Sequence, residues 1–99
     1  MSDNTTRIEN NKEKQQYEIQ LDNGQLAVLT YQQTGDRITY LHTGVPPAFE
    51  GHGLAAALAH TALEDARSAH LTVIPSCPFV ARYIEHHPDY QPLIAKEDQ

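Results

Sequence analysis

The sequence predicts an α+β (α/β) fold, in which an antiparallel meander, a helix, a parallel strand and a second helix build one mixed β-sheet domain. Two changes of pattern lead to this prediction. Up to residue 43, apolar residues alternate with polar ones, as in strands with one buried face. From residue 55 they recur every three or four positions, as on an amphipathic helix, before a short apolar run at residues 71–74.

The chain is long enough for one hydrophobic core but not for two. It has 99 residues, of which 39% are hydrophobic. Residues 1–16 are mostly polar and are interpreted as a tail, frayed at least to Thr6. We expect flexible tails at residues 1–7 and 95–99 and a single domain over residues 8–94. The sequence leaves the oligomeric state open, with a monomer favoured.

Charge and cysteine content argue against several functional classes. A net charge of −6 disfavours nucleic acid as a partner, because that affinity depends on clustered Lys and Arg. We expect no membrane association, since no apolar stretch approaches the ~20 residues that span a bilayer. A lone cysteine, Cys77, cannot form an internal disulfide, and with no signal-peptide core at the start this predicts a cytoplasmic location.

Three strands are expected in the first half of the chain. Residues 17–21 alternate between apolar and polar side chains, and residues 26–33 are rich in β-formers. Between them, Asn23-Gly24 is typical of a type I′ hairpin turn, because both residues tolerate positive φ. A second turn at residues 34–37 leads to a third strand at residues 38–43. The three strands therefore form a meander.

A helix and a further strand follow the meander. Small apolar residues at three- and four-residue spacing predict a helix of roughly 17 residues from Ala55. Residues 71–74 form a short apolar run that ends at Pro75, which cannot donate to a sheet. A strand reached through a helix favours a crossover to a parallel neighbour.

A second, shorter helix is expected after Pro75. Ser76 is a suitable N-cap, and Pro78 is tolerated in the first turn, where N–H groups have no intrahelical partner. Residues 86–88 end this helix, and residues 89–94 are expected to add a last extended stretch. Four apolar side chains share one predicted face of the helix: Phe79, Val80, Tyr83 and Ile84.

The loop between the third strand and the first helix is the most informative segment. It contains Gly51 and Gly53 just before the helix begins. The first turn of a helix has N–H groups without partners and the positive end of the helix dipole, and glycine lets the backbone approach phosphate oxygens. The loop therefore predicts a pyrophosphate site. The alternative is that the glycines only allow a tight turn.

Residues 42–55 and 75–90 resemble the GNAT acyltransferase superfamily, and in particular its compact branch of predicted N-acetyltransferases. The coenzyme A pyrophosphate motif of that superfamily is [RQ]-x-x-G-x-[GA], and Glu50, Gly53 and Ala55 stand at its three defined places. The similarity in order and spacing extends from about Ile8 to Leu93. It implies a GNAT-like mixed sheet, acetyl-coenzyme A as a substrate, and transfer of acetyl to an unknown amine on a small molecule or protein.

The resemblance also implies where coenzyme A binds. In GNAT proteins the strand ending near Val45 splays from the next parallel strand, and the pantetheine arm lies in the gap. Backbone N–H groups there bond pantetheine amides or polarise the thioester carbonyl. The residues expected to contact coenzyme A are Thr43, Val45, Gly51, His52, Gly53, Leu54 and Ala55.

Two residues depart from the family pattern. Glu50 replaces the usual Arg or Gln, which brings negative charge close to the diphosphate. Gly44 stands where the compact branch usually has an acidic residue. His52 is a candidate to compensate for Glu50, because an imidazole beside phosphate becomes charged near neutral pH, although it is equally consistent with a solvated turn residue.

Cys77 and Tyr83 are the candidate catalytic residues. Cys77 follows the expected N-cap, where the helix dipole stabilises a thiolate that accepts the acyl group; alternatively it is a small buried hydrophobe. The resemblance places Tyr83 near a tyrosine that, in many GNAT enzymes, protonates the departing coenzyme A thiolate; alternatively it is a core aromatic residue. No Glu or Asp stands out as the base for a direct transfer.

Six histidines do not predict a metal centre. None forms an H-x-x-x-H pair or an H-E-x-x-H motif, so no metal cofactor is expected. The alternative to an enzyme is a non-catalytic acyl-coenzyme A-binding sensor or a protein-interaction module. A GNAT-like chain this short lacks the extra N-terminal elements that usually build an acceptor site, which keeps that alternative open.

Overall fold

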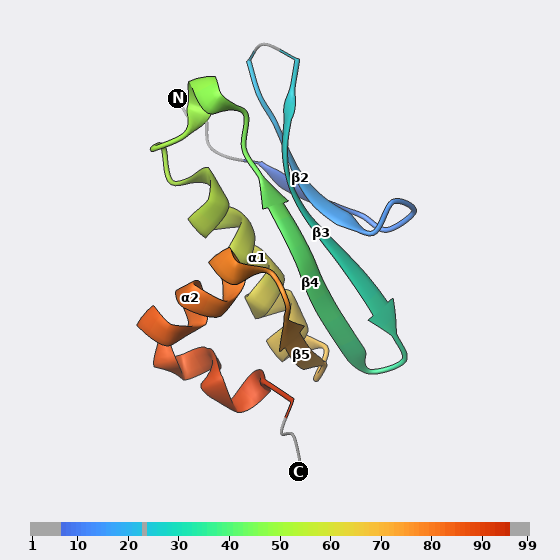
Figure 1. The fold of residues 1–99 in the computed structure, drawn as a ribbon. Coiled ribbons are helices and arrows are strands. Elements are labelled where there is room, and N and C mark those ends of the chain that lie inside the picture. Colours follow the sequence, from blue (N-terminus) through green and yellow to red (C-terminus); the bar gives the residue numbers. More distant parts are fainter. Residues whose placement is uncertain (1–6, 23, 96–99) are drawn as a thin grey trace.

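A computed structural model describes residues 7–22 and 24–95 of the chain (Figure 1). Among these residues, no helix is both long enough and apolar enough to cross a membrane. Asn23 of the predicted hairpin turn and nearly all of the predicted tails fall outside the described residues. The elements, in chain order, are β1 (Ile8–Asn11), β2 (Gln16–Gln20), β3 (Leu26–Thr34), β4 (Arg37–Gly44), the 3₁₀ helix η1 (Pro47–Phe49), α1 (Leu54–Ser68), β5 (Thr72–Pro75), α2 (Pro78–His86) and the 3₁₀ helix η2 (Pro88–Leu93).

The five strands form one mixed sheet in the order β1-β2-β3-β4-β5. The first four strands are antiparallel neighbours, and β5 lies parallel to β4. This confirms the predicted architecture of a meander, a helix, a parallel strand and a second helix. Helix α1 is slightly shorter than expected, at 15 residues.

Strand β1 was not expected from the sequence. It pairs with β2 so that Ile8 lies opposite Ile19 and Glu9 opposite Glu18. The Tyr31 hydroxyl donates a hydrogen bond to Asn10 Oδ1 at 2.6 Å, which ties the strand to the sheet interior. An edge strand needs only one row of backbone bonds and one apolar anchor, here Ile8. Such a strand can form with mostly polar side chains, and a composition of that kind does not predict a strand.

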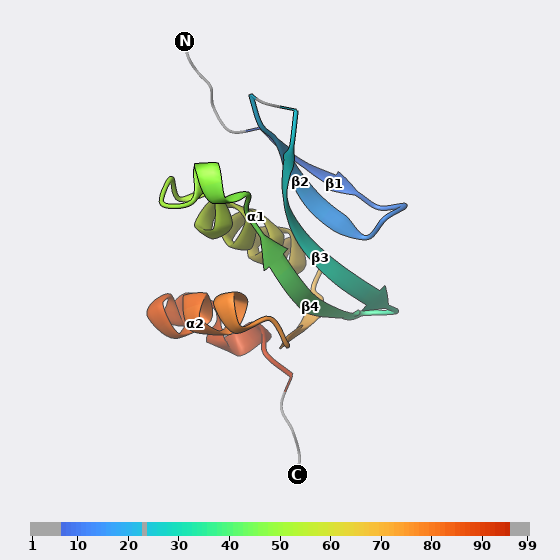
Figure 2. The same ribbon diagram turned by 45° about the horizontal axis from the view of Figure 1, so that its top comes forward.

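Both helices cover the same face of the sheet (Figure 2). Alanines on α1 let its backbone approach the sheet closely, so the Tyr40 hydroxyl donates to the carbonyl of Ala62 at 2.9 Å and the Tyr17 hydroxyl to Asp65 Oδ2 at 2.8 Å. Burial raises the pKa of both tyrosines, so they stay neutral donors. The core includes Tyr17, Ile19, Ala27, Leu29, Tyr31, Ile38, Tyr40, Leu58, Ala59, Ala62, Leu63, Ala66, Val73, Cys77, Val80 and Ile84.

Helix α2 begins one residue later than predicted, and Ser76 is not its N-cap. The N-cap is Cys77, whose side chain makes no capping hydrogen bond. The backbone N–H of Cys77 donates to the carbonyl of Tyr40 at 2.8 Å, and this bond to β4 holds Cys77 extended, with φ −74° and ψ 123°. Only Val80 and Ile84 of the predicted apolar face are buried.

The last stretch is also different from the prediction. Residues 88–93 form the 3₁₀ helix η2 rather than an extended segment. Proline at positions 88 and 92 removes backbone donors that a strand would use. Ile94 then returns to the sheet through a parallel bridge to Val73, and the Ala95 N–H donates to the Val73 carbonyl at 2.9 Å.

Candidate functional site

Strand β4 has two halves that differ in their partners. The paired half, Arg37–Tyr40, lies between β3 and β5. The open half, Leu41–Gly44, pairs with β3, but in the described part of the chain β5 has already ended opposite Tyr40, at Pro75. The chain then turns away into α2. One edge of the open half is therefore left without a strand beside it.

A β-bulge separates the two halves. The register passes from Tyr31 opposite Tyr40 to Thr30 opposite His42, so Leu41 is an extra residue in β4. An extra residue reverses the alternation of side chains beyond it. Thr43 therefore pairs with the buried Leu29 and faces the helices, whereas His42 lies on the opposite face.

A cavity of about 380 Å³ lies beside the open half of β4. It extends from the strand end to the beginning of α1, with the first turn of α2 as its other wall. Six of the seven residues predicted to contact coenzyme A line it; His52 does not. The lining residues are Thr43, Val45, Phe49, Glu50, Gly51, Gly53, Leu54, Ala55, Ala56 and Phe79.

The glycine loop leaves the N-terminus of α1 open toward this cavity. Gly51 and Gly53 have φ of +86° and +77°, values that residues with a Cβ rarely adopt. Gly53 is the N-cap of α1, which has neither a side-chain cap nor an acidic residue in its first turn. A Cβ added to either glycine would have no neighbour within 4 Å. The first-turn N–H groups thus face accessible space, as an anion site requires.

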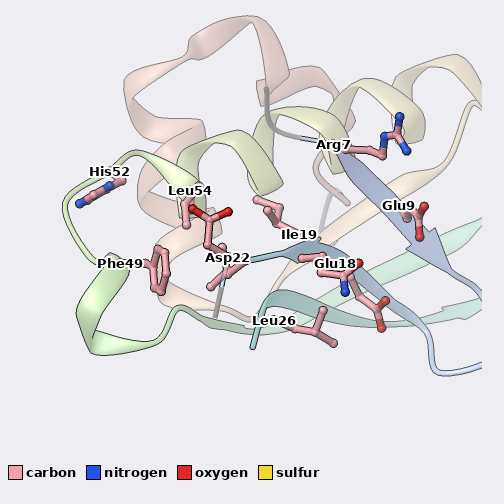
Figure 3. Close-up of a pocket in the computed structure, with 11 residues that line it drawn as sticks. Arg7, Glu9, Glu18, Ile19, Asp22, Leu26, Phe49, His52 and Leu54 are labelled. Carbon is pink, nitrogen blue, oxygen red and sulfur yellow. The ribbon is translucent and has the colours of Figure 1, made fainter. Parts of the chain in front are cut away.

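His52 lies at a different cavity, on the other side of the loop (Figure 3). This cavity measures about 520 Å³ and shares Phe49 and Leu54 with the first one. Its charged lining is mainly acidic, with Glu9, Glu18 and Asp22 against Arg7. Although larger, it therefore suits a diphosphate less well than the cavity beside β4. His52 therefore does not line the cavity beside β4 with the six other predicted contact residues, and of these six it shares the second cavity only with Leu54.

Cys77 lies next to the open half of β4 but is shielded from solvent. Its side chain is 2% exposed, and its Sγ lies 3.1 Å from Thr43 Oγ1. Thr43 itself lines the cavity. The bulge makes this contact possible, because it turns the Thr43 side chain toward the helices. The predicted thiol thus lies directly behind the cavity wall.

Tyr83 does not line the cavity beside β4, although its ring stacks with Phe79 of the cavity wall at a centroid distance of 6.4 Å. Its ring stacks on His87 at a centroid distance of 4.0 Å and lies 6.3 Å from the ring of Tyr90. Burial and the nearby charge of Glu64 raise the pKa of Tyr83. A raised pKa and this position make Tyr83 a weak candidate for protonating a thiolate in the cavity.

Two aromatic residues in the cavity wall were missed at the level of the sequence. Phe49 projects from η1, and Phe79 projects from the first turn of α2 with 37% of its surface exposed. The sequence places Phe79 only on the apolar helical face that it shares with Val80, Tyr83 and Ile84. An aromatic residue in a glycine loop, such as Phe49, was the one available indication of a ligand surface.

The described residues contain no group of three or more His, Cys, Asp or Glu side chains that could hold a metal ion. Two of the histidines lie at the end of α2 and contact its backbone. His86 and His87 each place Nδ1 near a backbone carbonyl one turn earlier, at 3.1 and 2.8 Å. The last carbonyls of a helix have no intrahelical partner, and the negative end of the helix dipole favours a histidine side chain beside them.

Comparisons with known proteins agree on one family. The family described as GCN5-related N-acetyl-transferase matches residues 16–93. Protein NATD1 of Mus musculus is 38% identical over 89 residues, covering 83% of this chain and 76% of the relative, and Protein NATD1 of Danio rerio is 33% identical over 93 residues, covering 88% and 81%. The solution structure of a GCN5-like protein from Staphylococcus aureus superposes with a TM-score of 0.72 at 26% identity, over 98% of this chain and 95% of that one.

Proposed function

This chain belongs to the GCN5-related N-acetyltransferase family, and we propose that it binds acetyl-coenzyme A beside β4 and transfers the acetyl group to an amine. The observation that carries the proposal is the cavity of about 380 Å³, which joins the open edge of β4 to the uncapped N-terminus of α1. A single ligand that carries both amide groups and a diphosphate matches these two features.

The diphosphate is assigned to the beginning of α1. The first-turn N–H groups and the positive end of the helix dipole favour an anion there. Gly51 and Gly53 keep the approach free of side chains, because neither has a Cβ. Glu50 is exposed on the same loop and opposes the anion, so we expect modest rather than tight binding.

The pantetheine arm is assigned to the open edge of β4. Its amides resemble peptide groups and would bond the strand edge as an added strand does. The thioester carbonyl would then accept from a β4 backbone N–H, which stabilises the oxyanion formed when the carbonyl carbon is attacked. This role requires backbone groups only and makes no demand on the side chains of Thr43 and Val45.

Two routes for the acetyl group follow from this placement. In the direct route the amine attacks the thioester, and the carbon–sulfur bond to coenzyme A breaks. In the covalent route the Cys77 sulfur attacks first, its proton passes to the departing coenzyme A sulfur, and the amine then attacks the acetyl-cysteine. The Thr43 hydroxyl, 3.1 Å from Sγ, would hold the thiol in position for the second route.

A non-catalytic acyl-coenzyme A sensor is the second candidate function. Two observations favour it: Glu50 lines the cavity in which the diphosphate is assigned, and Cys77 is only 2% exposed. A sensor needs the cavity and a response to the acyl group, but no open path for an acceptor.

Calorimetry with acetyl-coenzyme A, followed by turnover with a panel of amines, separates these functions. We expect binding, and release of free coenzyme A that depends on an amine. Binding without turnover would favour the sensor, and no binding would contradict both candidates. Intact mass after incubation with acetyl-coenzyme A tests the covalent route. An added acetyl group that maps to Cys77 and is lost in Cys77→Ser supports that route, and its absence leaves only direct transfer.

A further inference from the structure

We propose that the cavity of about 520 Å³ on the other side of the glycine loop binds a small organic amine, held as its ammonium ion with an apolar chain against the cavity floor. The inference goes beyond the proposed acetyl transfer and does not depend on it. A protonated amine has no free electron pair with which to attack a thioester, so this site is distinct from the position where an acceptor would react. Phe49 and Leu54 line both cavities and stand between them.

The floor of this cavity is apolar. Ile19 and Leu21 belong to the buried core, with 3% and 9% of their surface exposed, and Phe49 and Leu54 pack against that core. Leu26 adds a large apolar side chain that is 39% exposed. Burial of apolar surface is favourable, so these side chains favour a ligand with a hydrocarbon chain over one that is polar throughout.

Acidic side chains surround this floor and give the lining an excess of negative charge. The carboxylates are those of Glu9, Glu18 and Asp22. Arg7 supplies one positive charge against these three, which leaves an excess of two negative charges when His52 is neutral. Within the described part of the chain, no ion pair joins Arg7 to any of the three carboxylates. The cavity therefore attracts a cation.

Two of the carboxylates are available to a ligand. Glu9 and Asp22 are exposed, and neither has a side-chain hydrogen bond or an ion pair among the residues that the structure describes. Glu18 is held in place, because its Oε2 accepts from Asn11 Nδ2 at 3.0 Å and from Gln16 Nε2 at 2.6 Å. A primary ammonium group has three donors and no acceptor, so it complements carboxylates that lack partners.

The walls fit a small molecule better than a segment of another protein. The lining side chains project from β1, β2, β3, η1, α1 and the turn after β2 around one space (Figure 3). Asp22 lies on the side of Phe49, whereas Glu9 and Glu18 lie on the opposite side, with Ile19 between them. The volume of about 520 Å³ falls within the range of roughly 300–1,000 Å³ that is usual for small-molecule sites.

Titration of isotope-labelled protein with hexylamine at neutral pH, followed by the backbone amide signals, tests the site. We expect saturable binding, with the largest shifts at Ile19, Leu26 and Phe49. Hexanol should bind at least about fivefold more weakly at low salt and hexanoate more weakly still, because only the ammonium ion meets the carboxylates. From butylamine to hexylamine the affinity should rise by up to about fourfold for each added CH₂.

Two variants with matched controls separate the charge from the apolar floor. Asp22→Asn should weaken hexylamine binding by about three- to fivefold and leave hexanol binding unchanged. Asp36→Asn is its control, because Asp36 is also exposed but does not line the cavity. Leu26→Thr should weaken the binding of both ligands. Leu41→Thr is the control for that variant, because Leu41 is 45% exposed and also lies outside the lining.

Saturable hexylamine binding that depends on Asp22 and Leu26 supports the inference. The inference is overturned if hexylamine does not bind, if hexanol binds equally well, or if the largest shifts lie away from this cavity. If N-acetyl-lysine N-methylamide binds more tightly than hexylamine, the occupant is a lysine side chain and the assignment to a small molecule is overturned. None of these titrations contains acetyl-coenzyme A, so the failure of the proposed transfer and the failure of this inference are observed separately.

Discussion

The paired and open halves of β4 belong to one strand but have opposite properties. In the paired half, Ile38 and Tyr40 are 3% and 0% exposed, and β3 and β5 satisfy the backbone on both sides. In the open half one edge has no strand beside it among the residues that the structure describes, and His42 is exposed. The change occurs over a single extra residue, Leu41, opposite the point where Pro75 ends β5.

This difference shows how a small sheet makes a binding site without extra domains. Ending one strand early leaves backbone donors and acceptors at an edge, and the bulge places consecutive side chains on the two faces. The unpaired edge lowers stability, which the paired half and its helix contacts must offset. Substitutions in the paired half should therefore change stability, and substitutions near the open half should change binding.

The largest effect is expected from Gly53→Val, beside the open half. A branched side chain would lie where the diphosphate is assigned, and we expect acetyl-coenzyme A binding to weaken by several kcal/mol, a loss on the order of 100-fold or more. Because Gly53 has φ of +77°, the variant also carries backbone strain of about 1–2 kcal/mol. Calorimetry measures the binding, and chemical denaturation measures the strain.

Gly35→Val is the matched control for that variant. Gly35 has φ of +60° in the turn before the paired half, and a Cβ there would also have no neighbour within 4 Å. It should lose comparable stability and keep full binding. Equal binding losses in the two variants would mean that strain, and not the ligand site, explains the Gly53 result.

Tyr40→Phe probes the paired half with a smaller effect. It removes the hydroxyl that donates to the Ala62 carbonyl at 2.9 Å, while the ring still fills the same buried space. We expect the free energy of unfolding to fall by about 1 kcal/mol, the usual net value of such a bond. Acetyl-coenzyme A affinity measured by calorimetry should not change. A loss of affinity would show that the two halves are coupled.

Glu50→Arg returns to the open half and should improve binding. Glu50 is exposed on the cavity wall, and a cation in its place attracts the diphosphate. We expect acetyl-coenzyme A to bind about 1 kcal/mol more tightly at low salt, with a gain that fades as ionic strength rises. Titration at two salt concentrations measures this. An unchanged affinity at low salt would indicate that Glu50 points away from the ligand.

The meander strands and α1 could largely be predicted from the sequence, because burying one face of an element makes apolar residues recur at a fixed spacing. Alternation gave the three meander strands, and the spacing of alanines gave α1, since a helix against a sheet must be apolar and narrow on one side. Strand β1 was not predicted because an edge strand with a single apolar anchor, Ile8, leaves no period in the sequence. The start of α2 was misplaced because a long-range bond from Cys77 to Tyr40 decides it.

The candidate site was predicted where it depends on local backbone and missed where it depends on distant contacts. The glycine loop follows from residue type, since positive φ and a helix start are local properties. The bulge at Leu41 has no local mark, so the sequence did not indicate that Thr43 would face Cys77 or that His42 would lie over Gly44. Phe79 and Tyr83 share a helical face with the buried residues of α2, and only tertiary packing decides which residues of that face are buried.

The smallest predicted effect concerns the cluster that holds η2 against α1 and so supports β5 in the paired half. The Tyr90 hydroxyl donates to Glu64 Oε2 at 2.6 Å and lies 3.2 Å from His60 Nδ1, while the Arg67 guanidinium lies 5.0 Å from the centre of the Tyr90 ring. Burial and the bond to Glu64 raise the pKa of Tyr90 to about 12. The hydroxyl therefore remains a donor throughout the physiological range.

The hydrogen bond from Tyr90, and then the charge of Arg67, lower the pKa of Glu64 in the folded protein. A carboxylate with a lowered folded pKa contributes stability above its unfolded value of about 4.3, and this contribution is lost as the pH falls through the folded pKa. Tyr90→Phe should therefore lower the urea midpoint slightly at pH 7, with a difference that shrinks as the pH falls below about 4. Tyr31→Phe is the matched control, because its hydroxyl donates at 2.6 Å to Asn10, an amide that does not titrate. A Tyr90→Phe difference that stays constant with pH, as expected for Tyr31→Phe, would mean that packing rather than the carboxylate sets the contribution of this cluster.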